Sequence, residues 1–188
     1  MLQSITVFCG SSDDCPAVYL DTAEALGQLI ARQGRRLIYG SGCCGLMGRL
    51  AKGAKEAGGH IVGVNAVCYA AYGPYPGTDE YIMADTLHQR KEHLLRLGDG
   101  FIALPGGMGT LDELTDLFAI IQSGQVDRPL GILNVQGYYD GFLLQCRRAL
   151  FDHLLKEKDY DRLLVAETPE DMLNLLDACG ERQTEKTD

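Results

Sequence analysis

The chain has 188 residues, and its formal charge of -9 at pH 7 argues against nucleic acid or an anionic membrane as a partner. Hydrophobic residues at 46% and charged residues at 23% are typical of one globular domain with a sizeable core. No apolar run approaches the ~20 residues of a membrane span, and the N-terminal residues read as a strand rather than a signal peptide. Seven scattered cysteines without zinc spacing indicate reduced thiols in a cytoplasmic protein.

Short apolar runs alternate with helical patterns along the whole chain. The first part is predicted to hold a strand at 5–8, a helix from 16 that Gly34 ends, a strand at 36–39, a glycine loop at 40–45, a helix at 46–57, a strand at 61–65 and a loop at 68–79. The second part is predicted to hold strands at 81–84, 101–104, 130–133 and 163–166, and helices at 86–97, 110–122, 138–156 and 169–178.

This alternation predicts crossover connections and an α/β fold, with one doubly wound parallel sheet in a single domain. The domain is expected to cover residues 1–180 and to leave 181–188 as a frayed polar tail. In such sheets ligands bind beyond the carboxyl ends of the strands. Three loops belong to that edge, at 10–14, 40–45 and 105–109.

The most informative motif is PGGMGTLDE at 105–113, which joins an apolar run to a helical pattern. Its glycines let the backbone come close to a ligand, and exposed amides at a helix start favour phosphate. Glu113 follows one turn into the same helix. A phosphate site and an acid–base group therefore come as one unit, which suggests chemistry on a phosphorylated small molecule.

A second glycine motif, GSGCCG at 40–45, matches G-x-G-x-x-G between a strand and a helix. A dinucleotide site also needs an acid about 20 residues further on, at the end of the next strand, to bind the ribose hydroxyl. That strand ends here in Asn65, and the next acid is Asp79. A mononucleotide contact is therefore favoured over the two alternatives, a dinucleotide site and a plain tight turn.

Arg90 lies on the apolar stripe that Leu87, Leu94 and Leu97 form in the helix at 86–97. A guanidinium on a core-facing stripe needs an anion, because its desolvation is costly. The alternatives are a side chain that reaches solvent and a purely structural ion pair. Arg90 is therefore a candidate for a functional site.

Glu113 lies on a semi-apolar flank of its own helix, beside Leu117 and Ile120, whereas Asp112 and Asp116 point away from the core. A glutamate in a first helical turn also serves capping and the helix dipole, which is the alternative. A carboxylate and an arginine, each on an apolar flank beside a glycine loop, make a natural pair. Such a pair can tune the carboxylate for catalysis.

The remaining polar groups allow two interpretations each. Ser11 follows the first strand, where a phosphate or ribose contact and a plain turn fit equally well. The Cys43–Cys44 pair is either redox-active or, in the interpretation that we favour, packed in its loop. Three tyrosines of the 68–79 loop either shape a pocket or belong to a surface or dimer loop: Tyr69, Tyr72 and Tyr75.

With these motifs the chain resembles the LOG family, the cytokinin riboside 5'-monophosphate phosphoribohydrolases, many of which carry the older label "lysine decarboxylase-like". GSGCCGLMG at 40–48, the Arg90–Lys91 pair and PGGMGTLDE at 105–113 occur in the family's order and at suitable spacing. The resemblance implies a Rossmann-like fold and a homodimer with its sites at or near the subunit interface. It also implies hydrolysis of the N-glycosidic bond of an adenosine monophosphate derivative, which gives free base and ribose 5-phosphate.

The resemblance further implies roles for single residues. The family's catalytic residues fall on Arg90 and Glu113. Its phosphate and nucleotide contacts fall on Ser11, Gly42, Lys91, Gly106, Gly107, Gly109 and Thr110. The family usually has three glycines where this chain has Gly40-Ser41-Gly42, and often a methionine at Leu94, so base preference stays open.

The expected function is hydrolysis of a purine nucleoside 5'-monophosphate, without a metal or cofactor. Ionised Glu113 would stabilise positive charge on the ribose ring and orient water. Arg90 would hold Glu113 in place or bind the substrate. A non-catalytic nucleotide- or cofactor-binding protein is the alternative, because it would use the same glycine loops without requiring Glu113.

Overall fold

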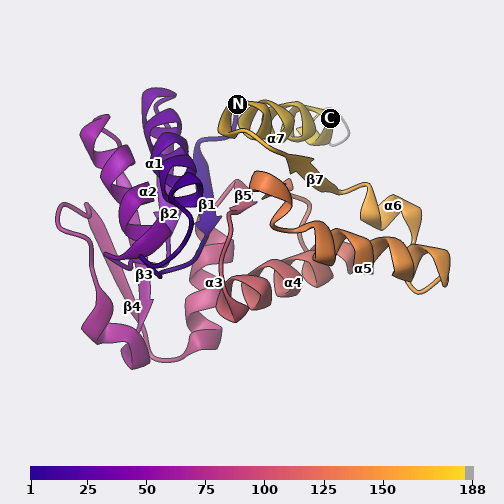
Figure 1. Ribbon diagram of the computed structural model, residues 1–188, viewed down its shortest axis with the longest axis horizontal. Coiled ribbons are helices and arrows are strands. Elements are labelled where there is room, and N and C mark those ends of the chain that lie inside the picture. The colour runs from indigo at the N-terminus through magenta and orange to yellow at the C-terminus, as the bar shows by residue number, and fades with distance from the viewer. Residues whose placement is uncertain (185–188) are drawn as a thin grey trace.

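The computed structural model describes residues 1–184 and contains one parallel sheet with helices on both faces (Figure 1). The strands of the sheet are β1 (Ser4–Phe8), β2 (Arg36–Tyr39), β3 (Ile61–Ala66), β4 (Glu80–Ala84), β5 (Gly100–Ala103), β6 (Leu130–Leu133) and β7 (Leu163–Ala166). The α-helices are α1 (Ala17–Arg32), α2 (Gly45–Glu56), α3 (Leu87–Leu97), α4 (Met108–Gln122), α5 (Asp140–Phe151), α6 (Glu157–Tyr160) and α7 (Pro169–Thr184). Two 3₁₀ turns complete the described elements, η1 (Val67–Tyr72) and η2 (Val135–Gly137).

The two faces of the sheet have separate apolar cores because successive side chains of a strand point to opposite faces. In β1, Ile5 and Val7 pack with α1, α2 and α7, whereas Phe8 packs with α3, α4 and α5. In β2, Tyr39 lies in the first core and Ile38 in the second. The predicted α/β fold with a doubly wound sheet is therefore confirmed.

The strand order, β4-β3-β2-β1-β5-β6-β7, places the topological switch at β1. β1 pairs with β2 on one side and with β5 on the other, so the chain winds in opposite directions from this point. Ligands of open α/β sheets bind in the crevice at such a switch, beyond the carboxyl ends of the strands. The loops after β1, β2 and β5 meet there.

The predicted long helix at 138–156 is wrong, because α5 ends at Phe151 and the short α6 follows. His153 adopts a left-handed conformation with a φ of 58°. The amides of His153 and Leu154 then bond back to the carbonyls of Leu150 and Ala149, at 3.0 and 2.8 Å. This is the Schellman pattern that ends many helices, here with a histidine where glycine is usual.

Smaller differences concern element ends. α4 begins at Met108 rather than at 110, and the loop after β3 contains the turn η1. α7 continues to Thr184, past the predicted end at 178 and into the segment expected to be a tail. The rest of that segment, 185–188, lies outside the described residues. No helix within residues 1–184 has the length and apolar character needed to cross a membrane.

Ser41→Gly is predicted to raise the free energy of unfolding by about 1 kcal/mol, because Ser41 is held in an unfavourable conformation and environment. Its φ is 65°, it is fully buried, and its hydroxyl has no hydrogen-bond partner among the described residues. Glycine adopts this conformation without strain and has no hydroxyl to leave unpaired. It loses more chain entropy on folding than serine does, but this loss is smaller than the gain. Urea unfolding of Ser41→Gly checks the gain. Ser123→Gly, at an ordinary φ of -72°, is the control and is expected to stabilise nothing.

Candidate functional site

A cavity of about 720 Å³ opens at the sheet edge where the loops after β1, β2 and β5 meet. Its volume is within the usual range for small-molecule sites. Eight of the nine predicted site residues line it: Ser11, Gly42, Arg90, Lys91, Gly107, Gly109, Thr110 and Glu113. Gly106 is not among the residues that line the cavity. The structure thus brings together residues from four separate segments of the chain.

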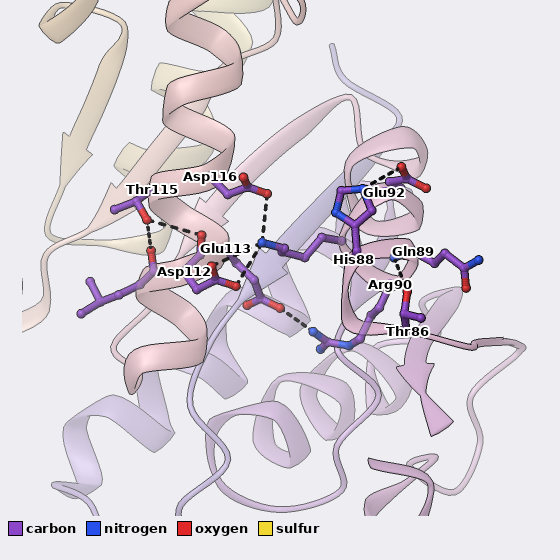
Figure 2. A network of polar contacts seen from close by, with 11 residues as sticks. Thr86, His88, Gln89, Arg90, Glu92, Asp112, Glu113, Thr115 and Asp116 are labelled. Atoms are coloured by element: carbon purple, nitrogen blue, oxygen red, sulfur yellow. Dashed lines mark hydrogen bonds and ion pairs between the residues drawn. The ribbon is translucent and has the colours of Figure 1, made fainter. Parts of the chain in front are cut away.

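Arg90 and Glu113 form a buried ion pair between α3 and α4, and Figure 2 shows the two side chains pointing toward one another. Arg90 Nη1 lies 2.6 Å from Glu113 Oε1, and Arg90 Nε donates to the carbonyl of Val64 at 3.1 Å. The residues are 7% and 8% exposed. Arg90 is therefore paired with an anion, as predicted, and the alternative that its side chain reaches solvent is excluded.

Burial raises the pKa of the Glu113 carboxyl above its ordinary value, because a charge in a desolvated site is unfavourable. The charge and the hydrogen bond of Arg90 oppose this shift without cancelling it. Arg90 therefore favours the ionised form of Glu113, and burial favours the protonated form. A carboxylate in this state is poised for proton transfer or for stabilising a nearby positive charge.

Lys91 bridges the same two helices further toward the surface. Its Nζ lies 3.2 Å from a carboxylate oxygen of Asp112 and 3.2 Å from one of Asp116. Burial lowers the pKa of Lys91, but these two carboxylates outweigh it, and the net shift is upward. Asp112 and Asp116 lie off the core face, as predicted, and the structure adds that both are paired with Lys91.

The loop before α4 is held from behind through its carbonyl groups. The hydroxyl of Tyr138 donates to the carbonyl of Gly106 at 2.5 Å, and the amide of Gly10 donates to the carbonyl of Pro105 at 3.0 Å. Gly107 is the N-cap of α4, and open space surrounds Gly107 and Gly109 where side chains would otherwise project. Because the first amides of an α-helix have no partner within the helix, this end of α4 can receive an anion from the cavity.

The glycine loop after β2 forms the opposite wall. Gly45, with a φ of 59°, lies so close to Ser11 that a side chain there would collide with its backbone. The carboxylate of Asp13 accepts a hydrogen bond from the Gly45 amide at 2.8 Å. A Cβ at Gly40 would lie 2.2 Å from Nη2 of Arg90, so a side chain there would displace this guanidinium.

Several lining residues differ from the sequence expectation. Leu87 was predicted to face the core, but it is 44% exposed and lines the cavity, because it starts α3 at the cavity mouth. Tyr69 and Tyr72 of η1 also line the cavity, whereas Tyr75 packs against the core beside α1 and α2. Asp13 was not identified, since an acid in a turn carries no distinguishing pattern.

Asn65, at the position where a dinucleotide site would have an acid, also lines the cavity. Its side-chain amide donates to the carbonyl of Tyr69 and to the hydroxyl of Tyr81, each at 3.2 Å. Asp79, the next acid in the chain, accepts from the amide of Ile61 at the amino end of β3, on the opposite edge of the sheet. This arrangement does not favour a dinucleotide site.

Known proteins share both the sequence and the fold. Residues 47–176 match the family model "Possible lysine decarboxylase". The probable cytokinin riboside 5'-monophosphate phosphoribohydrolase LOGL6 of Oryza sativa subsp. japonica is 37% identical, over 97% of this chain and 75% of the relative. The cytokinin riboside 5'-monophosphate phosphoribohydrolase LOG5 of Arabidopsis thaliana is 36% identical, over 94% of this chain and 78% of the relative.

A molybdenum cofactor binding protein from Rippkaea orientalis has a similar structure, with a TM-score of 0.71 and 23% identity over 95% of this chain and 97% of its own. This likeness concerns the fold alone. The sequence matches extend over the Arg90–Glu113 pair and the glycine loops that surround the cavity. The chain therefore belongs to the LOG family of cytokinin riboside 5'-monophosphate phosphoribohydrolases.

Proposed function

We propose that the protein is a phosphoribohydrolase that cleaves the N-glycosidic bond of adenosine 5'-monophosphate or its N6-substituted derivatives. Water is consumed, and free base and ribose 5-phosphate are released. The observation that carries the proposal is the buried Arg90–Glu113 pair, which lines the same cavity as the exposed start of α4. The family supports it, because its named relatives are phosphoribohydrolases of cytokinin riboside 5'-monophosphates.

In this proposal the 5'-phosphate binds at the N-terminus of α4, where exposed amides and the helix dipole favour an anion. The groups assigned to it are the amides of Gly107 and Gly109 and the amide and hydroxyl of Thr110, which line the cavity. Gly106 does not line it and is assigned the role of shaping the loop, where Tyr138 binds its carbonyl. Ser11, Gly42 and Lys91 are assigned further contacts with the nucleotide. Fixing the phosphate places the ribose over the Arg90–Glu113 pair, one helical turn further on.

Glu113 then acts on the ribose. As the bond to the base breaks, positive charge develops on the ring, and the ionised carboxylate stabilises it and orients the attacking water. Arg90 touches Glu113 directly and keeps it ionised and in position against the desolvation that raises its pKa. The low exposure of the pair strengthens its electrostatic effect, because water does not screen it.

We also propose a cytoplasmic homodimer with its sites at or near the subunit interface. Seven free cysteines are consistent with a reducing compartment. Large apolar side chains on α5 and just beyond it support an interface, since Leu144, Phe151 and Leu154 are 62%, 78% and 81% exposed. Sedimentation equilibrium tests the dimer.

The function is tested by incubating the protein with AMP, with isopentenyl-AMP and with adenosine, and assaying free base. Release from either monophosphate, but not from adenosine, supports the proposal, because only the monophosphates carry the group that the start of α4 is proposed to bind. Binding of the monophosphates without release of base would instead support the non-catalytic alternative. The ratio of the two monophosphate rates defines the base preference.

Gly40→Ala is predicted to lower the rate of base release by about a hundredfold, the usual effect of misplacing a catalytic group by about 1 Å. The added methyl would lie 2.2 Å from Nη2 of Arg90 and would push the guanidinium away from Glu113. Steady-state assays with AMP measure the loss. Gly141→Ala, which has open space at its Cβ, is the control and should keep the parent rate. An unchanged rate in Gly40→Ala would contradict the positioning of Arg90.

A further inference from the structure

Cys43 and Cys44 have no part in the proposed hydrolysis, yet both line its cavity. The sequence favoured thiols packed in their loop, but the structure shows both side chains exposed, with the two Sγ atoms 3.8 Å apart. The amide and the thiol of Cys43 contact the carbonyl of Tyr72, at 3.4 and 3.5 Å. The pair is thus accessible, held in place, and located where a ligand would enter.

The surroundings distinguish the two thiols. Cys44 is the N-cap of α2, so the pair lies at the positive end of a helix dipole, which favours one thiolate. The hydrogen bond to Cys43, followed by the charge of that residue, raises the pKa of the Cys44 thiol. The carboxylate of Asp13 accepts from the amide of Gly45 at 2.8 Å, next to Cys44, and its negative charge disfavours a thiolate at Cys44. Cys43 is therefore the member of the pair that we consider for reaction.

We propose that Cys43 is a thiol-modification site, at which a low-molecular-weight disulfide of the glutathione disulfide type forms a mixed disulfide that closes the nucleotide cavity. The closing effect rests on the proposed function of this cavity. The Cys43 thiolate attacks one sulfur of the disulfide, a new S–S bond forms, and the original S–S bond breaks. The leaving thiolate takes up the proton that Cys43 released, so one reduced thiol is produced for each adduct.

Backbone geometry favours the mixed disulfide over a bond between the two cysteines. Adjacent Cα atoms of a trans peptide are about 3.8 Å apart, less than the roughly 4.4 Å at which ordinary disulfides begin. A Cys43–Cys44 disulfide would therefore be strained and easily reduced. Attack by Cys44 on the adduct would form this strained disulfide and is therefore disfavoured. The mixed disulfide persists until an external thiol attacks the sulfur of the bound group, takes that group up in a new disulfide and restores the Cys43 thiol.

The test compares Cys43 with Cys68, which is also exposed but lies on η1 and is not among the lining residues. The whole protein is treated with glutathione disulfide, and the adduct at each cysteine is measured by peptide mass spectrometry. The parent is expected to carry the adduct at Cys43 and to lose AMP binding and base release in proportion to the modified fraction. Dithiothreitol should restore both, and AMP should slow modification of Cys43 but not of Cys68.

Matched variants separate the site from a general thiol effect. After treatment, Cys43→Ser should keep the binding and the rate that it had before treatment, whereas Cys68→Ser should lose as much as the parent. Equal losses in Cys43→Ser and the parent, or no adduct at Cys43, would overturn the proposal. The adduct and AMP binding are measured without turnover. If the protein does not hydrolyse AMP, the proposed function is contradicted, but these two measurements still test the modification of Cys43.

Discussion

Glu113→Gln is expected to lower the rate of base release from AMP and isopentenyl-AMP by about a thousandfold, the scale of losing a buried group that stabilises transition-state charge. Glutamine retains an oxygen that can accept the hydrogen bond of Arg90, which in the parent measures 2.6 Å. It lacks the negative charge that the ribose ring needs as positive charge develops. Binding of the monophosphates should change little, because their phosphate is proposed to bind at the start of α4.

Asp116→Asn is the matched control for this experiment. It removes a carboxylate from the same helix, one that pairs with Lys91 at 3.2 Å but does not line the cavity. Its rate of base release should remain near that of the parent, because exposed ion pairs contribute only about 0–1 kcal/mol. Turnover retained in Glu113→Gln, or lost equally in Asp116→Asn, would exclude Glu113 as the group that stabilises the ring.

The sequence was sufficient to predict the pair because both partners break the apolar pattern of their helices. Arg90 interrupts a stripe of leucines, and Glu113 lies beside Leu117 in the next helix along the chain. Burying such side chains is unfavourable unless they meet, so two separate anomalies predict one contact. The strands were predictable for a related reason, since short apolar runs bounded by glycines suit the two-sided burial of a parallel sheet.

Other features depend on tertiary structure and left no pattern. His153 adopts the left-handed conformation that ends many helices, but this position is usually a glycine. Without a glycine there, the sequence predicts a continuous helix to 156. Leu87 has the spacing of a core residue but starts its helix at a cavity mouth. The exposure of Cys43 could not be inferred either, because a free cysteine behaves as a small apolar residue in many loops.

The depth of the Arg90–Glu113 pair explains why the two residues must be considered together. Burial alone would favour protonated Glu113, and the same burial would penalise a lone guanidinium. Each charge is tolerated because the other is present, and Val64 supplies a further acceptor for Arg90. A pair of this kind is weak evidence for stability, since apolar residues would often pack as well, so its position beside a cavity supports the role proposed for it.

Arg90→Ala is expected to destabilise the protein by about 3–5 kcal/mol near neutral pH, because it leaves a buried carboxylate without its partner. It should also abolish base release at pH values where the parent is active. The substitution removes the charge and the hydrogen bond of Arg90, which oppose the effect of burial, so the pKa of Glu113 rises further above its ordinary value. Any remaining activity that needs the ionised carboxylate should therefore appear only at higher pH, so the acid limb of the pH–rate profile moves upward.

Acid pH should further reduce the activity of Arg90→Ala, but it should reduce the loss of unfolding free energy that the substitution causes. A carboxyl whose pKa is higher in the folded than in the unfolded state binds its proton more tightly when folded. Its contribution to stability is fully present below the unfolded pKa and is lost as pH rises through the folded pKa. The unfolding free energy that Arg90→Ala loses relative to the parent should thus become smaller toward acid pH, as measured by urea unfolding across a pH series.

Arg96→Ala, an exposed change in the last turn of α3, is the control and should stay within about 0.5 kcal/mol of the parent. A deficit that is independent of pH would contradict the coupling between Arg90 and Glu113.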